Sequence, residues 1–303
     1  MILPVNLSNR GFKGGWCGKK ISSKVIDTIR AEFPENIYYQ IVIWKDKDHF
    51  DEITELLKTQ DYTDAIAVGG DGTVNHVAKT ILNTNIRLGI VPIGSGNGLA
   101  FTAGIPKNPG KALEIIIQGE ATYIDSFYIN GQFSCMLCGL GLDAQVAHDF
   151  AKQKSRGLST YVKQSIRNFF SAKAYPFTIT TENISIHTHA FFISIANSNQ
   201  FGNNVTIAPK ASLSDGLLDI VVVNKMNKMK MIYSFARQVT SGKVQEQFEK
   251  DRSQKSIQYF QAKNIIIHNP GNAPLHIDGE PASTSEKFEI KIIERAFRLI
   301  CKK

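Results

Sequence analysis

The hydrophobic positions of the first 120 residues form short apolar runs that alternate with longer amphipathic segments. The apolar runs occupy residues 39–44, 65–68 and 88–93, and segments with helical spacing occupy residues 19–32, 50–58, 72–83 and 109–119. Alternating strands and helices are typical of a parallel sheet with helices on both faces. We therefore expect residues 1–122 to form an α/β domain.

The pattern changes to strands after residue 120. Apolar runs with the length of strands occupy residues 122–129, 132–141, 177–186, 190–196, 217–223, 264–268, 275–277, 287–293 and 296–302. Turn sequences such as Asn130-Gly131 separate several of them, which favours antiparallel pairing. Two helical stretches, at about residues 144–174 and 228–250, interrupt the strands. We expect residues 123–293 to form a mainly antiparallel β-sandwich, and residues 294–303 to return to the first domain.

The composition is that of a globular protein, and the net charge indicates an anionic partner. The chain of 303 residues is 43% hydrophobic and 20% charged, as in globular proteins. No apolar stretch approaches the ~20 residues of a membrane-spanning helix, and the N-terminus lacks the features of a signal peptide, so we expect a cytoplasmic protein. The net charge of +8 favours an anionic partner. Residues 151–181 and 221–245 contain basic residues and no acid, which fits either solvated helices or a membrane contact.

Cysteines and histidines do not form a convincing metal site in the sequence. Cys135 and Cys138 have the spacing of a zinc or redox pair, but the other two cysteines lie near the chain ends without matching spacing. The pair also lies in an apolar run, so we expect buried free thiols. His187 and His189 share one face of a strand but have no evident third ligand, so we expect structural or surface histidines.

Two glycine clusters follow two of the apolar runs directly. Gly69-Gly70-Asp71-Gly72-Thr73 follows residues 65–68, and Gly94-Ser95-Gly96-Asn97-Gly98 follows residues 88–93. A strand that leads through glycines into a helix presents backbone N–H groups and a positive helix end to a phosphate. Asp71 could bind Mg²⁺ or cap a helix. The chain has neither the dinucleotide fingerprint nor a P-loop lysine, so we expect both loops to hold one nucleotide.

The two clusters resemble the diacylglycerol kinase catalytic domain family, which groups bacterial soluble lipid kinases with sphingosine and ceramide kinases. The resemblance rests first on residues 68–75 and 92–100. Further similar motifs follow in the order of the family, at residues 139–144, 156–161, 196–204, 211–219 and 276–281. The resemblance implies a first domain of the NAD kinase and diacylglycerol kinase type, followed by a β-rich lipid-substrate domain.

The resemblance also implies an activity and its residues. The chain would be an ATP-dependent, Mg²⁺-dependent lipid kinase that phosphorylates a lipid hydroxyl. The leading candidate substrate is diacylglycerol, which would give phosphatidic acid. Asp278 would accept the hydroxyl proton, with Glu280 in the same polar network. Mg²⁺ would bind the carboxylate of Asp215 and the backbone carbonyls of Ser212 and Leu217. ATP would contact both loops through Gly69, Gly70, Asp71, Gly72, Thr73, Val74, Asn75, His76, Gly94, Ser95, Gly96 and Asn97.

Other functions stay open at this stage. A sphingoid or other lipid kinase would have the same motifs, and a NAD kinase shares Gly-Gly-Asp-Gly but differs in the second loop and lacks the motifs at residues 214–217 and 278–281. A catalytically silent nucleotide- or lipid-binding regulator would fit the N-terminal residues 5–10, which depart from the Asn-Pro-x-Ser-Gly opening of the family. A nucleic-acid partner would explain the charge but neither the glycine loops nor the ordered carboxylates.

The lipid would be reached by peripheral contact with a membrane surface. Met226, Met229, Tyr233 and Ala236 have near-helical spacing beside basic residues, which fits either a membrane contact or core packing. A homodimer stays open.

Overall fold

The computed structural model describes residues 2–6, 23–33, 37–42, 49–59, 61–153, 164, 167–169, 171–200, 208–226 and 256–302. The expected helix at residues 228–250, the motif at residues 156–161 and most of the N-terminal opening lie outside the described residues. The chain divides into two compact units, residues 1–124 with 295–303 and residues 125–294. The sequence places this boundary between residues 122 and 123 and the return to the first domain at residue 294.

The first unit is a sheet with helices on both faces. Its described strands run in the order β15 (Lys287–Cys301, C-terminal end), β4 (Arg87–Pro92), β3 (Asp64–Gly69), β1 (Ile2–Asn6) and β2 (Tyr38–Tyr39). β3 and β15 are parallel to β4, whereas β1 is antiparallel to both of its neighbours. The α/β class is therefore confirmed, and the sheet is mixed, because an alternation of apolar runs does not encode strand direction.

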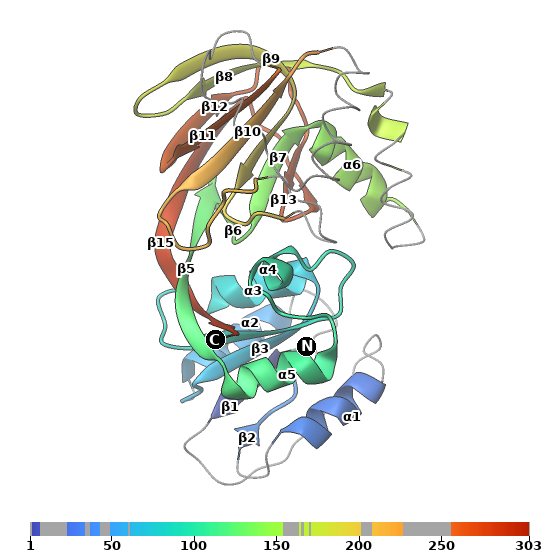
Figure 1. Cartoon of the computed structure of the whole chain (residues 1–303), viewed down its shortest axis with the longest axis vertical. Coiled ribbons are helices and arrows are strands. Elements are labelled where there is room, and N and C mark those ends of the chain that lie inside the picture. The colour runs from blue at the N-terminus through green and yellow to red at the C-terminus, as the bar shows by residue number, and fades with distance from the viewer. Residues whose placement is uncertain are drawn as a thin grey trace. The chain divides into compact units, whose positions relative to one another are not determined.

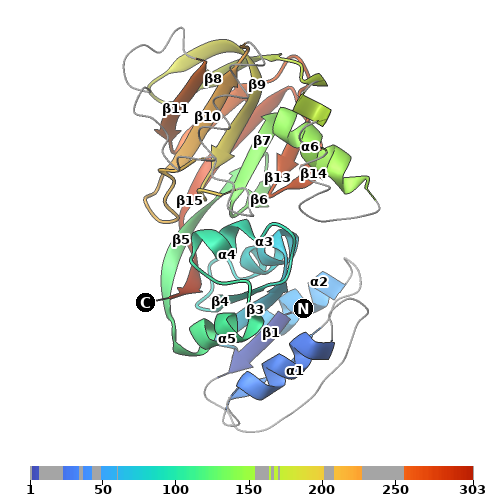
Figure 2. The same cartoon turned by 45° about the vertical axis from the view of Figure 1, so that its right-hand side comes forward.

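The helices of the first unit cover the sheet from two sides. α3 (Asp71–Thr80) and α4 (Gly98–Thr102) lie on one face, and α1 (Ser23–Glu32) and α5 (Pro109–Gln118) lie on the other (Figure 1 and Figure 2). The unit also contains α2 (His49–Thr59). Every residue of β3 is buried, as expected for a strand with helices on both faces. α5 begins where the side chain of Asn108 accepts the N–H of Lys111.

An ion pair joins the amino ends of β3 and β4. The guanidinium of Arg87 donates through Nε to Oδ1 of Asp64 at 2.6 Å and through a terminal nitrogen to Oδ2 at 2.9 Å. Asp64 is buried, and Arg87 is only partly exposed. Two parallel hydrogen bonds fix the two strands in register, so the loops at their carboxyl ends emerge side by side.

The second unit is a β-sandwich in which one long strand, β9 (Ser185–Ala196), contributes to both layers. Its first half pairs with β8 (Tyr175–Thr180), and its second half pairs with β7 (Leu137–Gly141) and β10 (Leu218–Asn224). The unit also contains β5 (Glu120–Ile129), β6 (Gln132–Ser134), β11 (Ile257–Ala262), β12 (Asn264–His268), β13 (Leu275–Ile277), β14 (Glu280–Ala282) and the first part of β15. The pairs of β6–β14 are antiparallel, as the sequence predicts.

The core of the second unit lies between these two layers. Ile193 of β9, Ile220 of β10 and Ile277 of β13 meet Phe177 of β8 and Phe288 of β15 in one buried cluster. Alternate residues of β13 and β7 point away from this cluster, toward α6 (Leu142–Ala151), which packs against β7, β13 and β14. His276 therefore lies on the face of the sheet that α6 covers.

Several element boundaries differ from the sequence-based expectation. The expected strand 177–186 is a hairpin, because β8 ends at Thr180 and the chain turns before Ser185. The expected pair of strands at 287–293 and 296–302 is one strand, β15, although Arg295 has a φ of 51°. The helix expected at 144–174 begins at Leu142 and ends at Ala151, with helical residues again near 164–171. β11 was not predicted.

Two local expectations, the turn at Asn130-Gly131 and the buried thiols, hold in the described residues. Asn130 and Gly131 both have positive φ values and join β5 to β6 in a tight turn, as the dipeptide predicts. Cys135 and Cys138 are buried free thiols, and burial raises the pKa of Cys138 well above its ordinary value. Among the described residues, no group of three or more histidine, cysteine, aspartate or glutamate side chains could together hold a metal ion. None of the helices described is long and apolar enough to cross a membrane.

Candidate functional site

The two glycine loops leave neighbouring parallel strands and pack directly against each other. Gly69 at the end of β3 is in register with Pro92 at the end of β4. A Cβ atom on Gly94 would lie 2.4 Å from the Cα atom of Gly70, and a Cβ on Gly70 would lie 3.1 Å from the Cα of Gly94. Residue 94 must therefore be glycine for the backbones to approach this closely, whereas a Cβ at residue 70 would require a shift of a few tenths of an ångström.

Asp71 ties the first glycine loop to the second. Its Oδ2 accepts the N–H of Asn97 at 2.8 Å, and its Oδ1 accepts the N–H of Gly98 at 2.7 Å. These N–H groups begin α4, so Asp71, the first residue of α3, caps a different helix across the loop contact. Of the two roles that the sequence left open for Asp71, the structure shows the capping one.

Asn97 closes the second loop on itself. Its Oδ1 accepts the N–H of Gly94 at 2.9 Å, and its Nδ2 donates to the carbonyl of Gly94 at 2.9 Å. Asn97 is buried and has a φ of 59°, a left-handed conformation that asparagine tolerates better than most residues. Its side chain therefore shapes the loop, and the expected nucleotide contact would have to come from its neighbours.

The remaining loop residues differ in what they present. Val74 is buried and its N–H already donates to the carbonyl of Gly70, so neither group is presented to a ligand. Gly72 is exposed, with no atom within 4 Å of where its Cβ would lie. In any α-helix the N–H groups of the first turn have no partner within the helix, so Gly72 and Thr73 at the start of α3 form the part of this loop suited to a phosphate.

The other expected nucleotide residues lie along the same two loops. A Cβ on Gly69 would collide with the side chain of Thr73, which packs over it. Ser95 is exposed, whereas Gly96, Thr73, Asn75 and His76 are half-buried.

His76 contributes no positive charge near neutral pH. Burial, followed by the charge of Lys79, lowers its pKa to about 4, against a smaller opposing effect of Asp51. The positive potential that α3 offers to a phosphate must therefore come from its main-chain N–H groups rather than from this imidazole.

In the second unit, Asp278 occupies a strained turn between β13 and β14. Asp278 has a φ of 48° and Gly279 a φ of 81°, both in the left-handed region. Such a conformation costs about 1–3 kcal/mol for a residue other than glycine, and it persists where surrounding contacts fix it. One of these contacts is the N–H of Asp278, which donates to the carbonyl of Leu137 at 2.8 Å.

The carboxylate of Asp278 is buried and receives hydrogen bonds from the segment between β6 and β7. Its Oδ1 accepts the Ser134 hydroxyl at 2.6 Å and the N–H groups of Met136 and Leu137 at 3.1 and 3.0 Å. Its Oδ2 accepts the N–H of Cys135 at 3.2 Å. Successive main-chain N–H groups form a concave anion site, which offsets the cost of burying the charge.

This contact explains why the expected strand 132–141 is two strands. The N–H groups of Cys135 and Met136 bond to the carboxylate instead of a neighbouring strand, so β6 ends at Ser134 and β7 begins at Leu137. A local hydrophobic pattern does not reveal this break, because the carboxylate lies more than 140 residues later in the chain.

Glu280 does not share the hydrogen bonds of Asp278. Glu280 is exposed at the first position of β14 and makes no side-chain hydrogen bond to another described residue. The polar network expected to join Glu280 to Asp278 is therefore absent from the described part of the chain, because the residues that hold Asp278 come from the segment between β6 and β7.

The expected metal loop, residues 212–217, is organised by an aspartate that the sequence analysis missed. The N–H of Asp125 donates to the carbonyl of Leu213 at 2.6 Å, and its Oδ2 accepts the N–H of Gly216 at 2.7 Å. Asp125 is buried, whereas Asp215 is exposed and accepts the N–H of Leu217 through Oδ1 at 3.1 Å. A signal for Asp125 was its position as an acid in an otherwise apolar strand.

A buried carboxyl group lies beside this loop. Asp219 is fully buried, and its Oδ2 has no hydrogen-bond partner among the described residues. Burial raises its pKa to about 7 against a hydrogen bond from Gln261, and the charge of Asp215 adds to the rise. Carboxylate and carbonyl oxygens are the ligands that Mg²⁺ prefers, so Ser212, Asp215 and Leu217 fit such an ion chemically. The glycine loops belong to the first unit, and this loop and Asp278 belong to the second.

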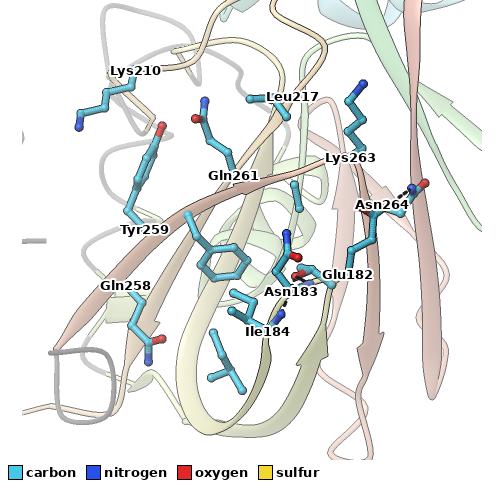
Figure 3. A pocket seen from close by; sticks show the side chains of 14 residues that line it. Glu182, Asn183, Ile184, Lys210, Leu217, Gln258, Tyr259, Gln261, Lys263 and Asn264 are labelled. Atoms are coloured by element: carbon cyan, nitrogen blue, oxygen red, sulfur yellow. Dashed lines mark hydrogen bonds between the residues drawn. The ribbon is translucent and has the colours of Figure 1, made fainter. Parts of the chain in front are cut away.

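The second unit also contains a pocket of about 580 Å³ (Figure 3). Apolar side chains such as Ile184 and Phe260 line it together with Lys210 and Gln261. Of the residues expected at the site, only Leu217 lines this pocket. The pocket is therefore distinct from the carboxylate cradle of Asp278.

The contact between the glycine loops predicts that one added methyl group destabilises the fold at residue 94 but not at residue 72. Gly94→Ala should lower the free energy of unfolding by about 1–3 kcal/mol, because the new Cβ meets the backbone of Gly70. Gly72→Ala is the matched control and should leave that free energy unchanged or raise it by up to about 1 kcal/mol. Urea denaturation of both variants measures the difference. Equal stability of the two would contradict the close approach of the loops.

The sequence matches the models of two known families, one for each part of the chain. Residues 15–129 match the family "Diacylglycerol kinase catalytic domain", and residues 137–301 match the family "YegS C-terminal NAD kinase beta sandwich-like domain". The chain is similar to "Probable lipid kinase YegS" of Salmonella arizonae, at 29% identity over 77% of this chain and 76% of the relative. It is also similar to "Probable lipid kinase YegS-like" of Enterobacter sp. (strain 638), at 26% identity over 92% of each chain.

Solved structures show the same fold. A diacylglycerol kinase from Bacillus anthracis superposes with a TM-score of 0.66 at 20% identity, over 92% of this chain and 89% of that one. A second structure from the same organism superposes with a TM-score of 0.72 at 22% identity, over 92% of this chain and 90% of that one. The two family matches together span both units of the fold. The chain therefore belongs to the diacylglycerol kinase family of lipid kinases, in the form that carries a YegS-type C-terminal β-sandwich domain.

Proposed function

We propose that this chain transfers the γ-phosphoryl group of ATP to the hydroxyl of diacylglycerol and so forms phosphatidic acid. The observation that carries the proposal is the pair of glycine loops that Asp71 locks together at the carboxyl ends of two parallel strands. In open α/β sheets, ligands bind at this edge. Membership of a lipid kinase family supports the nature of the reaction.

On the donor side, the first turn of α3 binds the phosphates of ATP. Its N–H groups and the helix dipole stabilise negative charge, which phosphoryl transfer requires more than covalent help from the protein. The close contact between Gly70 and Gly94 keeps side chains away from this position. A bound Mg²⁺ would neutralise phosphate charge, and the oxygens of Ser212, Asp215 and Leu217 would hold it.

On the acceptor side, Asp278 accepts the proton of the lipid hydroxyl. A carboxylate within hydrogen-bond reach of that hydroxyl supplies the general base of the reaction. The main-chain N–H groups of Cys135, Met136 and Leu137 fix the orientation of this carboxylate. Fixed geometry matters because the attacking oxygen must meet the phosphorus in line.

The acceptor lipid reaches the enzyme by peripheral contact with a membrane on its cytoplasmic side. Lys152, Lys173 and Lys225 are exposed and belong to the two acid-free basic segments. Near an anionic surface, each such lysine contributes about 1 kcal/mol of attraction. The aromatic and methionine residues expected beside them in the second segment lie outside the described residues, apart from Met226.

A panel of acceptors tests the proposal. Radiolabelled ATP and Mg²⁺ are incubated with mixed micelles of diacylglycerol, sphingosine or ceramide. We expect the highest rate of labelled product formation with diacylglycerol. A preference for a sphingoid base would replace the substrate but keep the reaction. Transfer to NAD in place of every lipid would overturn the proposal, and so would ATP binding without transfer to any acceptor, as a silent regulator would show.

Asp278→Asn tests the base separately. The substitution keeps the size of the side chain but removes the charge that accepts a proton, so kcat should fall by about 10²-fold or more. The dissociation constant of ATP, measured by calorimetry, should stay within about threefold of that of the unmodified chain, since the donor loops are unchanged. Glu280→Gln is the matched control two residues away, and a larger loss of kcat in that variant would assign the base to Glu280.

A further inference from the structure

We propose that His276 and Asp143 form a positioning pair that holds the Asp278-Gly279 turn in its left-handed conformation. The pair joins α6 to β13 on the face of the sheet that α6 covers, and nothing in the reaction described above uses it. Its role follows from three observations: the place where the two side chains meet, the hydrogen-bonding state of the imidazole, and its contact with the turn. The inference rests on the proposed role of Asp278.

The two side chains meet over a glycine of β7. Nε2 of His276 lies 3.3 Å from Oδ2 of Asp143. Gly139 is the register partner of His276, and a Cβ there would lie 1.9 Å from Oδ2 of Asp143 and 2.6 Å from Nε2 of His276. The absence of a side chain at residue 139 therefore creates the space in which this pair forms. Both side chains are at least nine-tenths buried.

The contacts of Asp143 place it at the start of α6. Its Oδ1 accepts the N–H of Ala144 at 2.8 Å, in the first turn of the helix, where a negative charge is favourable. Gly141, with a φ of 93°, precedes the helix and turns the chain from β7 into it. The position of Asp143 is thus set by the strand and helix together rather than by His276.

The contacts of His276 assign its proton. The N–H of Gly279 donates to Nδ1 at 3.3 Å, so this nitrogen acts as an acceptor and carries no hydrogen. Nε2 then carries the proton and donates it to Asp143. The imidazole is therefore a bridge with a fixed direction: the carboxylate of Asp143 orients the ring, and the ring accepts the N–H of the turn.

The bridge ends on the residue that follows the proposed base. Gly279 is exposed, so its N–H would otherwise turn to water, and the bond to Nδ1 draws the turn back toward β13. On the other side, the N–H of Asp278 is held by the carbonyl of Leu137. The two bonds fix successive peptide groups, and so they set the direction in which the carboxylate of Asp278 leaves the turn.

Two conservative variants separate the two halves of the bridge. Asparagine at residue 276 places its amide oxygen the same number of bonds from Cα as Nδ1, so His276→Asn keeps an acceptor for Gly279. Glutamine places its amide nitrogen the same number of bonds from Cα as Nε2, so His276→Gln keeps the donor to Asp143 and loses the acceptor. Hydrogen exchange of the Gly279 amide, followed by NMR with labelled glycine, reports the turn directly.

The expected results differ between the variants. His276→Gln should speed exchange at Gly279 by about tenfold or more and lower kcat by about 10-fold to 100-fold, with the KM for ATP unchanged. His276→Asn should stay within about threefold of the unmodified chain in both measurements. Asp143→Leu removes the acceptor that orients the ring, so its exchange rate at Gly279 and its kcat should match those of His276→Gln. Asp143→Asn keeps an acceptor, so both quantities should stay near those of the unmodified chain.

A matched control excludes a general loss of packing. His148 is a second histidine that contacts β13, where its Nε2 lies 2.8 Å from the carbonyl of Leu275. His148→Gln should lower stability without changing exchange at Gly279 or kcat. Equal exchange at Gly279 in His276→Gln, His276→Asn and the unmodified chain would overturn the inference. Should the unmodified chain phosphorylate no lipid, the proposed function fails, and the exchange measurement still decides whether the pair holds the turn.

Discussion

The edge of the sheet that carries the two glycine loops depends on the carboxylate of Asp71, which accepts hydrogen bonds from the main chain of the other loop. Asp71 begins α3, yet its two oxygens accept the N–H groups that begin α4. The contact of Gly70 with Gly94 is possible only while the two loops are held together in this way. Because β3 and β4 are parallel neighbours, both loops emerge at one edge of the sheet, and Asp71 makes them a single surface.

In the second unit, two buried carboxylates likewise accept main-chain N–H groups. Asp278 accepts the N–H groups between β6 and β7, and Asp125 accepts an N–H of the loop at residues 212–217. In each case a buried carboxylate is stabilised by main-chain donors from a distant segment. A side chain held this way has little freedom to turn, so these acids contribute fixed positions and fixed charge. Asp219 is the contrast, because its Oδ2 has no such donor among the described residues.

The sequence predicts the parts of this fold that local patterns encode. The bounds of β12 and β13, the turn at Asn130-Gly131 and the alternation of the first unit follow from hydrophobic period and turn residues. The same patterns do not reveal β11 or the antiparallel direction of β1. The glycine loops could be located from the sequence, whereas the capping role of Asp71 depends on N–H groups more than 20 residues later. Residues 139–144 and 276–281 are recognisable as motifs, but the contact of His276 with Asp143 is not, because only the pairing of β7 with β13 brings the two motifs together.

We propose that Asp71 joins the glycine loops into one phosphate site and does not itself bind the metal. Calorimetric titration of ATP into Asp71→Ala, with and without Mg²⁺, separates these two roles. We expect the affinity for ATP to fall by the same factor, about tenfold or more, in both conditions, because two N–H groups of the second loop lose their acceptor and the site loses its shape. A loss confined to the titration with Mg²⁺ would instead make Asp71 a metal ligand.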